Sequence, residues 1–309
     1  MKISILGTES LGVRGLCCEV NANGRTFVID PGVSLDVMRQ GLPPHPSQIA
    51  IAGHVKKDII SALSRATDIV VSHYHGDHVP LRDPNPWQIS LADLPAPEGI
   101  GFWCKGEEGL SAISLERRRD LSRHLGRPLP RAEGQDDGTL HCSQPVFHGR
   151  PPSRVMMSRI VADGETFVHA SDMQLLDPRA VAVISAWQPS VLVASGPPLY
   201  LSRLSSEEER RVWSHAVFLA STIPTLILDH HLLRSLEGLA WLERLAATTE
   251  YAVLSAAEYM GRELLLLEAR REELYRDLPV PPGWHDAFAR GEATLEEWDR
   301  FSSQEGRNK

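Results

Sequence analysis

Three histidines and one aspartate lie within six residues of this chain. The segment reads Ser72-His73-Tyr74-His75-Gly76-Asp77-His78 and directly follows an apolar run that ends at Val71. In extended backbone, side chains two positions apart point to the same side, so His73 and His75 can bind one ion. A turn at Gly76 then brings Asp77 and His78 toward a second ion. Burying so many polar groups without partners would be costly, so the spacing favours a metal site over ordinary core packing.

The H-x-H-x-D-H pattern, together with the preceding Ile29-Asp30-Pro31-Gly32, resembles the metallo-β-lactamase superfamily. That resemblance implies further ligands at the ends of later strands. His148 follows a short apolar step, Asp172 follows the strand-like run 166–169, and His230 follows the run 225–228. Their order along the chain matches the family.

The resemblance also implies how these residues divide between two metals. His73, His75 and His148 would hold one divalent ion. Asp77, His78 and His230 would hold the other, and Asp172 would bridge both. Nitrogen-rich ligation with carboxylates favours zinc, and iron or manganese would also fit. We expect Asp77, His78 and Asp172 to be catalytic as ligands of a water-activating metal pair rather than as nucleophiles.

Several positions have rivals that the sequence leaves open. His231 is adjacent to His230, and we favour His230 because it is closer to the strand end. His141 competes with His148 but lacks an apolar strand immediately before it, and Asp163 competes with Asp172 but sits in a turn sequence, Ala162-Asp163-Gly164. Asp30 either orients a ligand imidazole or is simply a strand-end turn residue.

The fold implied is an α/β four-layer αββα sandwich: two mixed β-sheets face each other and helices cover the outside. Strands are predicted at 2–6, 16–21, 24–29, 68–72, 154–161, 165–169, 190–194 and 225–228. Helices are predicted at 55–66, 110–125, 206–221, 232–247 and 256–274. We expect a single domain over 1–309, with an insertion at about 81–144 and a helical C-terminal extension at about 250–309.

Composition narrows the class of protein further. The 309 residues carry 32 Lys and Arg against 40 Asp and Glu, a formal charge of −8. A negative molecule repels a phosphate backbone, so nucleic acid is a disfavoured partner. We expect a small-molecule or phosphate-containing substrate. The four cysteines form no C-x-x-C pair, and neither a signal peptide nor a long apolar segment is present. We therefore expect a cytoplasmic protein without a membrane anchor. A homo-oligomer is compatible with the sequence.

The function predicted is a binuclear metal-dependent hydrolase, in which a metal-activated water attacks an ester, phosphodiester or related bond. The sequence is most similar to a branch of the superfamily distant from the enzymes that hydrolyse antibiotics. The competing hypotheses are an iron-dependent, dioxygenase-like oxidoreductase on the same fold, a metal-dependent nuclease, and a purely structural metal site. Seven candidate ligands exceed the four that a closed structural site needs, so a purely structural metal site is disfavoured.

An arginine run forms a basic patch in the 81–144 segment. Arg117, Arg118 and Arg119 either make the solvated face of a helix or form a lid that recognises phosphate or carboxylate groups. Tyr200, in a proline-rich loop after a predicted strand, either contacts substrate or belongs to a structural turn.

Overall fold

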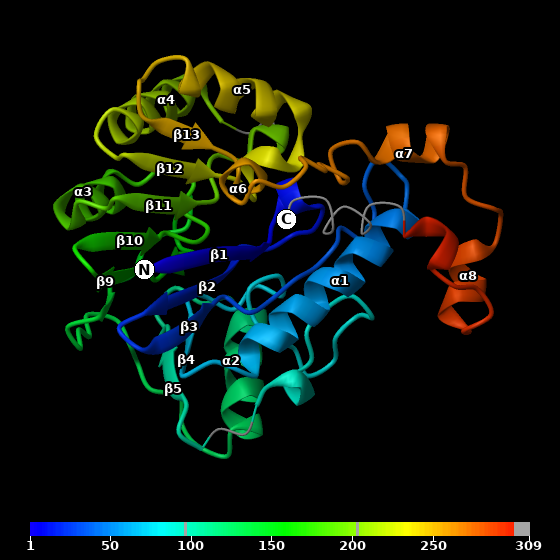
Figure 1. Cartoon of the computed structure of the whole chain (residues 1–309), viewed down its shortest axis with the longest axis horizontal. Helices are drawn as coiled ribbons and strands as arrows, with labels where there is room; N and C mark the ends of the chain where they lie inside the picture. The colour runs from blue at the N-terminus through cyan, green and yellow to red at the C-terminus, as the bar shows by residue number, and fades with distance from the viewer. Residues whose placement is uncertain (96–97, 202–203, 300–309) are drawn as a thin grey trace.

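Two mixed β-sheets face each other at the centre of the molecule (Figure 1). The computed structural model describes residues 1–95, 98–201 and 204–299. The first sheet has the order β1-β2-β3-β4-β5, with antiparallel pairs from β1 to β3 and parallel pairs from β3 to β5. Its strands are β1 (Lys2–Gly7), β2 (Cys17–Ala22), β3 (Arg25–Ile29), β4 (Asp68–Val71) and β5 (Gly101–Cys104).

The second sheet has the order β13-β12-β11-β10-β9-β6. Its strands are parallel from β13 to β10 and antiparallel from β10 to β6. They are β6 (Leu140–Cys142), β9 (Ser158–Ala162), β10 (Glu165–His169), β11 (Val191–Ala194), β12 (Thr225–Leu228) and β13 (Ala252–Leu254). A separate antiparallel pair, β7 (Val146–Phe147) with β8 (Arg154–Val155), lies beside it.

Alternation along the strands divides the apolar side chains among three cores. In β4, Val70 points between the two sheets, whereas Ile69 and Val71 point to the outer helices. In β11, Val193 points between the sheets and Leu192 points outward. Because both faces of each strand are buried, these strands read as continuous apolar runs.

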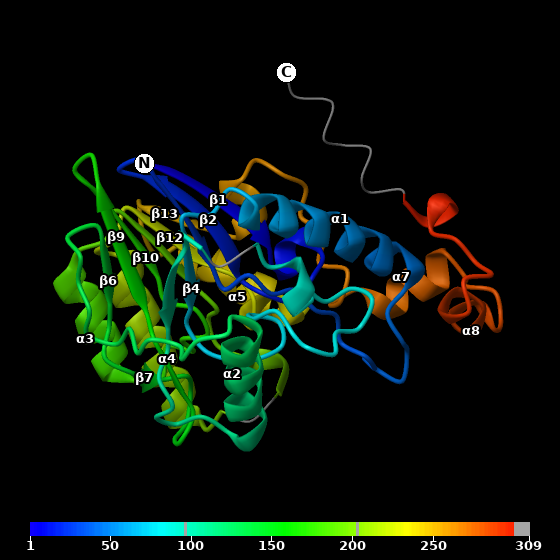
Figure 2. The same cartoon turned by 90° about the horizontal axis from the view of Figure 1, so that it is seen from below.

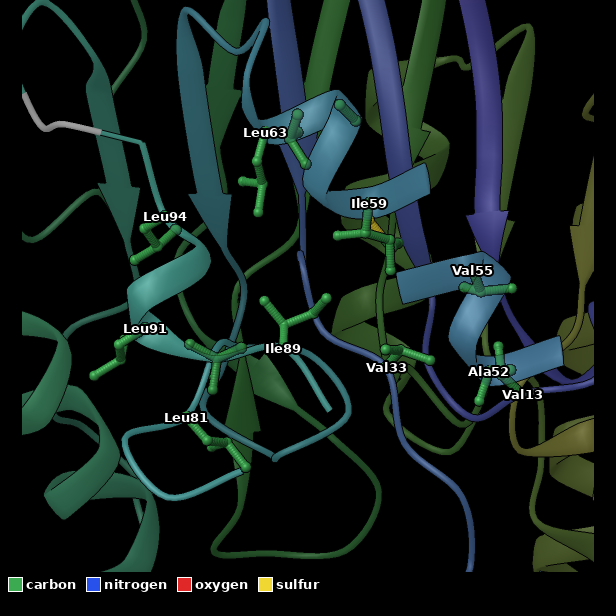
Figure 3. Close-up of a cluster of buried hydrophobic side chains, with 14 of the residues drawn as sticks. Val13, Val33, Ala52, Val55, Ile59, Leu63, Leu81, Ile89, Leu91 and Leu94 are labelled. Atoms are coloured by element: carbon green, nitrogen blue, oxygen red, sulfur yellow. The ribbon is translucent and has the colours of Figure 1, made fainter. Parts of the chain in front are cut away.

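Helices cover both outer faces. The helix α1 (Pro46–Leu63) packs on the first sheet, and α2 (Ala112–His124) contributes to the same core. Figure 3 shows Ala52, Val55, Ile59 and Leu63 of α1 directed at the apolar side chains of neighbouring segments, including Val33 and Ile89. The outer face of the second sheet is covered by α3 (Pro178–Trp187), α4 (Ser206–Ala220) and α5 (Leu236–Ala246). The predicted αββα sandwich is therefore confirmed.

Helix α1 begins nine residues before the predicted start. His45 caps its N-terminus by accepting a hydrogen bond from the backbone N–H of Ser47, and Pro46 occupies the first turn. His54 therefore lies inside α1, where its Nε2 lies 2.9 Å from Asp299 Oδ2.

The helix predicted at 256–274 is wrong. The chain forms only α6 (Ala256–Tyr259) and, after an irregular stretch, α7 (Arg271–Asp277). Gly261 breaks the helix at a φ of 62°, and Leu266 has a φ of 43°. Leu265 and Leu267 pack into the core under α1, whereas Leu266 packs into the core of the second sheet. The four consecutive leucines thus pack against all three cores instead of forming a continuous helix.

The predicted strand 154–161 is divided between β8 and β9, which belong to different sheets. The segment 81–144 contributes β5 to one sheet and β6 to the other, in addition to α2. Figure 2 shows α7 and α8 (Trp284–Ala289) at the end of the molecule beyond α1, where Trp284 and Trp298 join the core under α1. Among the described residues, no helix has the length and apolar composition needed to span a bilayer. The single-domain division of the chain stays a prediction.

Candidate metal centre

The H-x-H-x-D-H segment begins immediately after β4, where the backbone leaves the sheet. His73 Nε2 and His75 Nδ1 lie 3.0 Å apart, as expected for two side chains on one side of an extended segment. His148, directly after β7, completes this side: the ligand atoms of His73, His75, His148 and Asp172 all lie within 4.8 Å of one another. These four residues are called the first donor group below.

A second donor group consists of Asp77, His78 and His230. His78 Nε2 lies 3.2 Å from His230 Nε2, although 152 residues separate them in the sequence. Asp77 Oδ2 lies 3.6 Å from His230 Nε2. His230 comes from the end of β12 in the second sheet, so the two sheets supply opposite sides of this group.

Asp172 stands between the two groups, and each of its carboxylate oxygens faces one of them. Oδ2 lies 3.0 Å from His148 Nε2 and 3.3 Å from His73 Nε2. Oδ1 lies 3.1 Å from His78 Nε2 and 3.2 Å from His230 Nε2. All seven residues predicted to bind metal are therefore brought together.

Asp30 is a buried residue that supports the second donor group. Its Oδ2 accepts hydrogen bonds from His78 Nδ1 at 3.1 Å, from Ser72 Oγ at 2.6 Å and from Ser171 Oγ at 2.7 Å. A carboxylate can only accept, so this contact places a proton on His78 Nδ1 and turns Nε2 toward the donor group. Gly32 permits this arrangement, because a Cβ there would lie 2.5 Å from the backbone nitrogen of His78.

Glu9, which the sequence did not identify, holds His230 in the same way. It follows β1 in the short helical turn η1 (Glu9–Leu11) and is only 2% exposed. Its Oε2 accepts from His230 Nδ1 at 2.7 Å, and its Oε1 accepts from Arg234 Nε at 2.6 Å. The one sequence feature that could have identified Glu9 is its position as an acidic residue shortly after a strand. Nothing in the local spacing links it to His230.

Backbone strain is concentrated at this edge of the sheets. Asp30, Ser171 and His230 adopt φ values of 48°, 42° and 39°, in the left-handed region that non-glycine residues rarely occupy. Asp30 directly follows β3, Ser171 directly precedes Asp172, and His230 is itself a donor residue. Strain of this kind persists where surrounding contacts fix the backbone, and it commonly marks functional sites.

The donor set fits divalent cations. Asp172 is 1% exposed, and among the described residues its Oδ1 accepts no hydrogen bond of acceptable geometry despite the two ring nitrogens beside it. Two nitrogens and one oxygen therefore converge on a common point, as the ligands of a metal ion do. Imidazole with carboxylate oxygen suits zinc, iron and manganese.

Charge at the centre is consistent with cation binding. Burial opposes ionisation of Asp172, but the imidazoles of His78, His231 and His230 hold its pKa well below the ordinary range. Burial lowers the pKa of His73 to about 3, so this ring is neutral and able to donate a lone pair. At His78, burial is outweighed by Asp172 and Asp77, which raise its pKa well above the usual value. The carboxylates thus favour positive charge at this point.

Two of the three rival residues lie away from the centre, and the third lies in it. His141 pairs with Asp136 Oδ2 at 2.9 Å, away from the centre, and Asp163 lies in a turn beside the N-terminal ammonium. His231 does face the centre: its Nε2 lies 3.5 Å from Asp172 Oδ2, and its ring stacks on His230. With Asp172 and His230 it forms a further group whose ligand atoms all lie within 4.8 Å of one another, so the choice of His230 over His231 stays a prediction.

The arginine run divides into different roles. Arg117 donates to the carbonyl oxygen of Tyr74 at 3.0 Å, inside the first motif. Arg118 donates to the carbonyl oxygens of Lys105 and Leu129, whereas Arg119 is exposed. The Tyr200 hydroxyl accepts a hydrogen bond from Arg234 Nη1 at 3.2 Å.

Two facing mixed sheets, with this donor cluster at the ends of their strands, define a protein of the metallo-β-lactamase fold. Similar solved structures include zinc-bound PqqB from Methylobacterium extorquens, 12% identical, with a TM-score of 0.48 over 82% of this chain and 99% of that one. The metallo-β-lactamase fold protein YhfI from Bacillus subtilis is 11% identical, with a TM-score of 0.46 over 82% and 95%.

No family model matches the chain. A UPF0282 protein of Methanosarcina mazei is 47% identical over 301 residues, which cover 96% of this chain and 99% of that protein. The chain belongs to the UPF0282 family.

Proposed function

We propose that this protein is a binuclear metal-dependent hydrolase that cleaves an ester, phosphodiester or related bond. The observation that carries the proposal is the position of Asp172. Its Oδ2 faces three imidazoles of the first donor group, and its Oδ1 faces two imidazoles of the second. A buried carboxylate between two such groups is better explained as a bridging metal ligand than as a residue with a purely structural role.

In this proposal His73, His75, His148 and Asp172 hold one cation. Asp77, His78 and His230 hold the other, with Asp172 shared. Divalent ions bound there would supply Lewis acidity and lower the pKa of a water molecule to near neutrality. Zinc is the ion we favour.

The chain's own residues fix how the imidazoles bind. Asp30 accepts the Nδ1 proton of His78, and Glu9 accepts that of His230. Ser72 Oγ lies 2.9 Å from Nδ1 of His73. Each of these three rings therefore turns Nε2 toward the centre, in the tautomer and orientation that binding requires.

Substrate would approach from the side of the first donor group. The side chain of His75 is 43% exposed and that of His148 is 16% exposed, whereas in the second group His78 and His230 are fully buried and Asp77 is 17% exposed. A hollow of about 30 Å³ lies over His73, His75 and His148, and its other walls include Ser111, Ser114 and Arg154. Hydroxyl groups and a guanidinium at this entrance favour a polar or phosphate-containing small molecule.

The test combines metal analysis with a substrate screen. Protein purified without chelator is expected to contain about two zinc or manganese ions per chain. The same preparation should hydrolyse members of a phosphodiester, thioester and lactone panel, and the activity should disappear when a chelator removes the metal. Bound iron with oxygen consumption and no hydrolysis would favour the oxidoreductase hypothesis instead.

A further inference from the structure

The loop between β5 and α2 forms one wall of the hollow over the first donor group. Residues 106–111, called the wall loop below, contribute Gly109, Leu110 and Ser111 to the lining. Leu110 is the only apolar side chain among the six, and it packs at the edge of the core under α1. Apolar packing therefore gives this loop little support, and polar contacts have to fix its position.

Lys105 holds the wall loop from inside the protein. It directly follows β5, and its side chain is fully buried. Its Nζ donates hydrogen bonds to the carbonyl oxygen of Gly106, at 3.2 Å, and to that of Glu108. One ammonium group thus binds two backbone positions of the loop at once.

Glu133 completes this support from a neighbouring segment. Its Oε1 accepts a hydrogen bond from the backbone N–H of Gly106 at 2.7 Å and lies 3.9 Å from Lys105 Nζ. The Glu133 side chain is also fully buried. The approach is close, because a Cβ on Gly106 would lie 3.1 Å from the same Oε1. Lys105 and Glu133 therefore hold the start of the loop by its carbonyl groups and by its N–H group.

Lys105 also connects the wall loop to the metal-binding motif. Its carbonyl oxygen accepts a hydrogen bond from the Tyr74 hydroxyl at 2.7 Å. Tyr74 stands between His73 and His75 in the sequence and is fully buried. The backbone of Lys105 is thus tied to the first donor group, and its ammonium group is tied to the wall of the hollow. The separation between the metal ligands and the wall depends on this one residue.

Stability alone explains this buried pair of charges poorly. Replacing a buried ion pair by apolar residues of similar volume is often neutral or stabilising, because the desolvation penalty offsets the attraction. A charged group that donates to backbone carbonyl oxygens does supply strong and directional hydrogen bonds. The contacts of Lys105 therefore fit a requirement for a precisely placed loop.

We propose that Lys105 is a positioning residue for substrate: with Glu133 it holds the wall loop at a fixed distance from the first donor group and thereby sets substrate affinity. The inference rests on the proposed hydrolase function. Lys105 acts through the loop, because its buried ammonium group faces backbone carbonyl oxygens. A loop released from it would have to be ordered each time substrate binds, and that ordering opposes binding.

Lys105→Met tests the proposal, because it removes the charge and keeps a long, unbranched side chain. KM should rise about tenfold or more while kcat stays within about threefold of the wild-type value, since ordering of the loop then opposes binding. Steady-state kinetics use metal-loaded protein with bis(p-nitrophenyl) phosphate and p-nitrophenyl butyrate, a phosphodiester and an ester. Hydrogen–deuterium exchange should become faster in residues 106–111, and the metal content should not change.

Two further variants separate positioning from stability. Glu133→Gln keeps an acceptor for the N–H of Gly106 but removes the charge, so KM should rise in the same direction by about threefold. If Lys105→Met does not fold, Glu133→Gln carries the test. Arg25→Met is the matched control: it breaks the ion pair with Asp68 at the opposite end of β4. It should lower the unfolding temperature without changing KM or the exchange of residues 106–111.

Three results would overturn the inference. The first is a KM in Lys105→Met, or in Glu133→Gln if it carries the test, that equals the KM of Arg25→Met. The second is exchange in residues 106–111 as slow as in the wild-type protein. The third is a loss of bound metal together with kcat, because Lys105 would then support the metal centre itself. In all three cases the wild-type protein still hydrolyses its substrate, and the proposed function stands. Hydrolysis of neither compound by the metal-loaded wild-type protein would instead reject the proposed function together with the inference.

Discussion

The two donor groups meet at one carboxylate but are built differently. The first takes His73 and His75 from one short segment, opens to solvent through His75, and is supported by a single hydroxyl, that of Ser72. The second joins the buried His78 and His230 across the two sheets, leaves Asp77 17% exposed, and is held by Asp30, Glu9 and Arg234. We expect a division of labour in which the more accessible group meets substrate and the fold controls the charge and orientation of the more buried group.

The largest effect is expected at the residue that both groups share. Asp172→Asn keeps the side-chain volume but leaves only one oxygen, so it cannot serve both groups. Metal content should fall from about two ions to one or fewer, and kcat/KM should drop about a thousandfold or more. Inductively coupled plasma mass spectrometry and steady-state kinetics measure the two quantities.

Asp163→Asn is the matched control for Asp172, because Asp163 lies in an exposed turn 73% open to solvent. Its metal content and kinetics should equal those of the wild-type protein. Two tightly bound ions in Asp172→Asn would break the assignment of a shared ligand.

The second-largest effect is expected at Asp30, which supports His78 of the second donor group. Asp30→Asn removes the charge that fixes the Nδ1 proton of His78. Metal affinity at the second group should fall roughly 10- to 100-fold, as found for the partners of ligand imidazoles. Chelator competition measures it.

The control uses a pair of the same chemistry outside the centre. His141 and Asp136 are 2.9 Å apart on the surface, so Asp136→Asn should leave metal affinity unchanged. If Asp30→Asn and Asp136→Asn behaved alike, Asp30 would have no role in orienting His78.

Glu9→Gln should have a smaller and more local effect. The variant keeps an acceptor for His230 Nδ1 but removes the negative charge that offsets Arg234. Affinity at the second group should fall about tenfold, with the first group changed by no more than about threefold. Equal losses at both groups would show that the two are not supported independently.

The smallest effects concern the arginine run beside the motif. Arg117→Ala removes the hydrogen bond to the carbonyl oxygen of Tyr74 and should lower the free energy of unfolding by about 1–2 kcal/mol. Arg119→Ala, at an exposed position, should change it by less than about 0.5 kcal/mol. Chemical denaturation compares the two variants. A larger loss in Arg119→Ala than in Arg117→Ala would contradict the contacts described.

Local chemistry made the first donor group predictable. Its histidines are two residues apart directly after an apolar strand, and a strand-end rule located His148 and Asp172. Asp30 was one of the predicted candidates, but the other supports of the second group were not predictable, because Glu9 and Arg234 are 225 residues apart and meet only when the two sheets face each other. The helix predicted at 256–274 failed because tertiary packing divides its leucines among different cores, which the local sequence does not indicate.

The central claim is that Asp172 bridges two metal sites, and anomalous X-ray diffraction at the zinc edge tests it most directly. Crystals of zinc-loaded protein should show two anomalous peaks, one on each side of the Asp172 carboxylate. One peak should lie among His73, His75 and His148, and the other among Asp77, His78 and His230. Absence of any peak at Asp172, with zinc bound elsewhere in the molecule, would contradict the account.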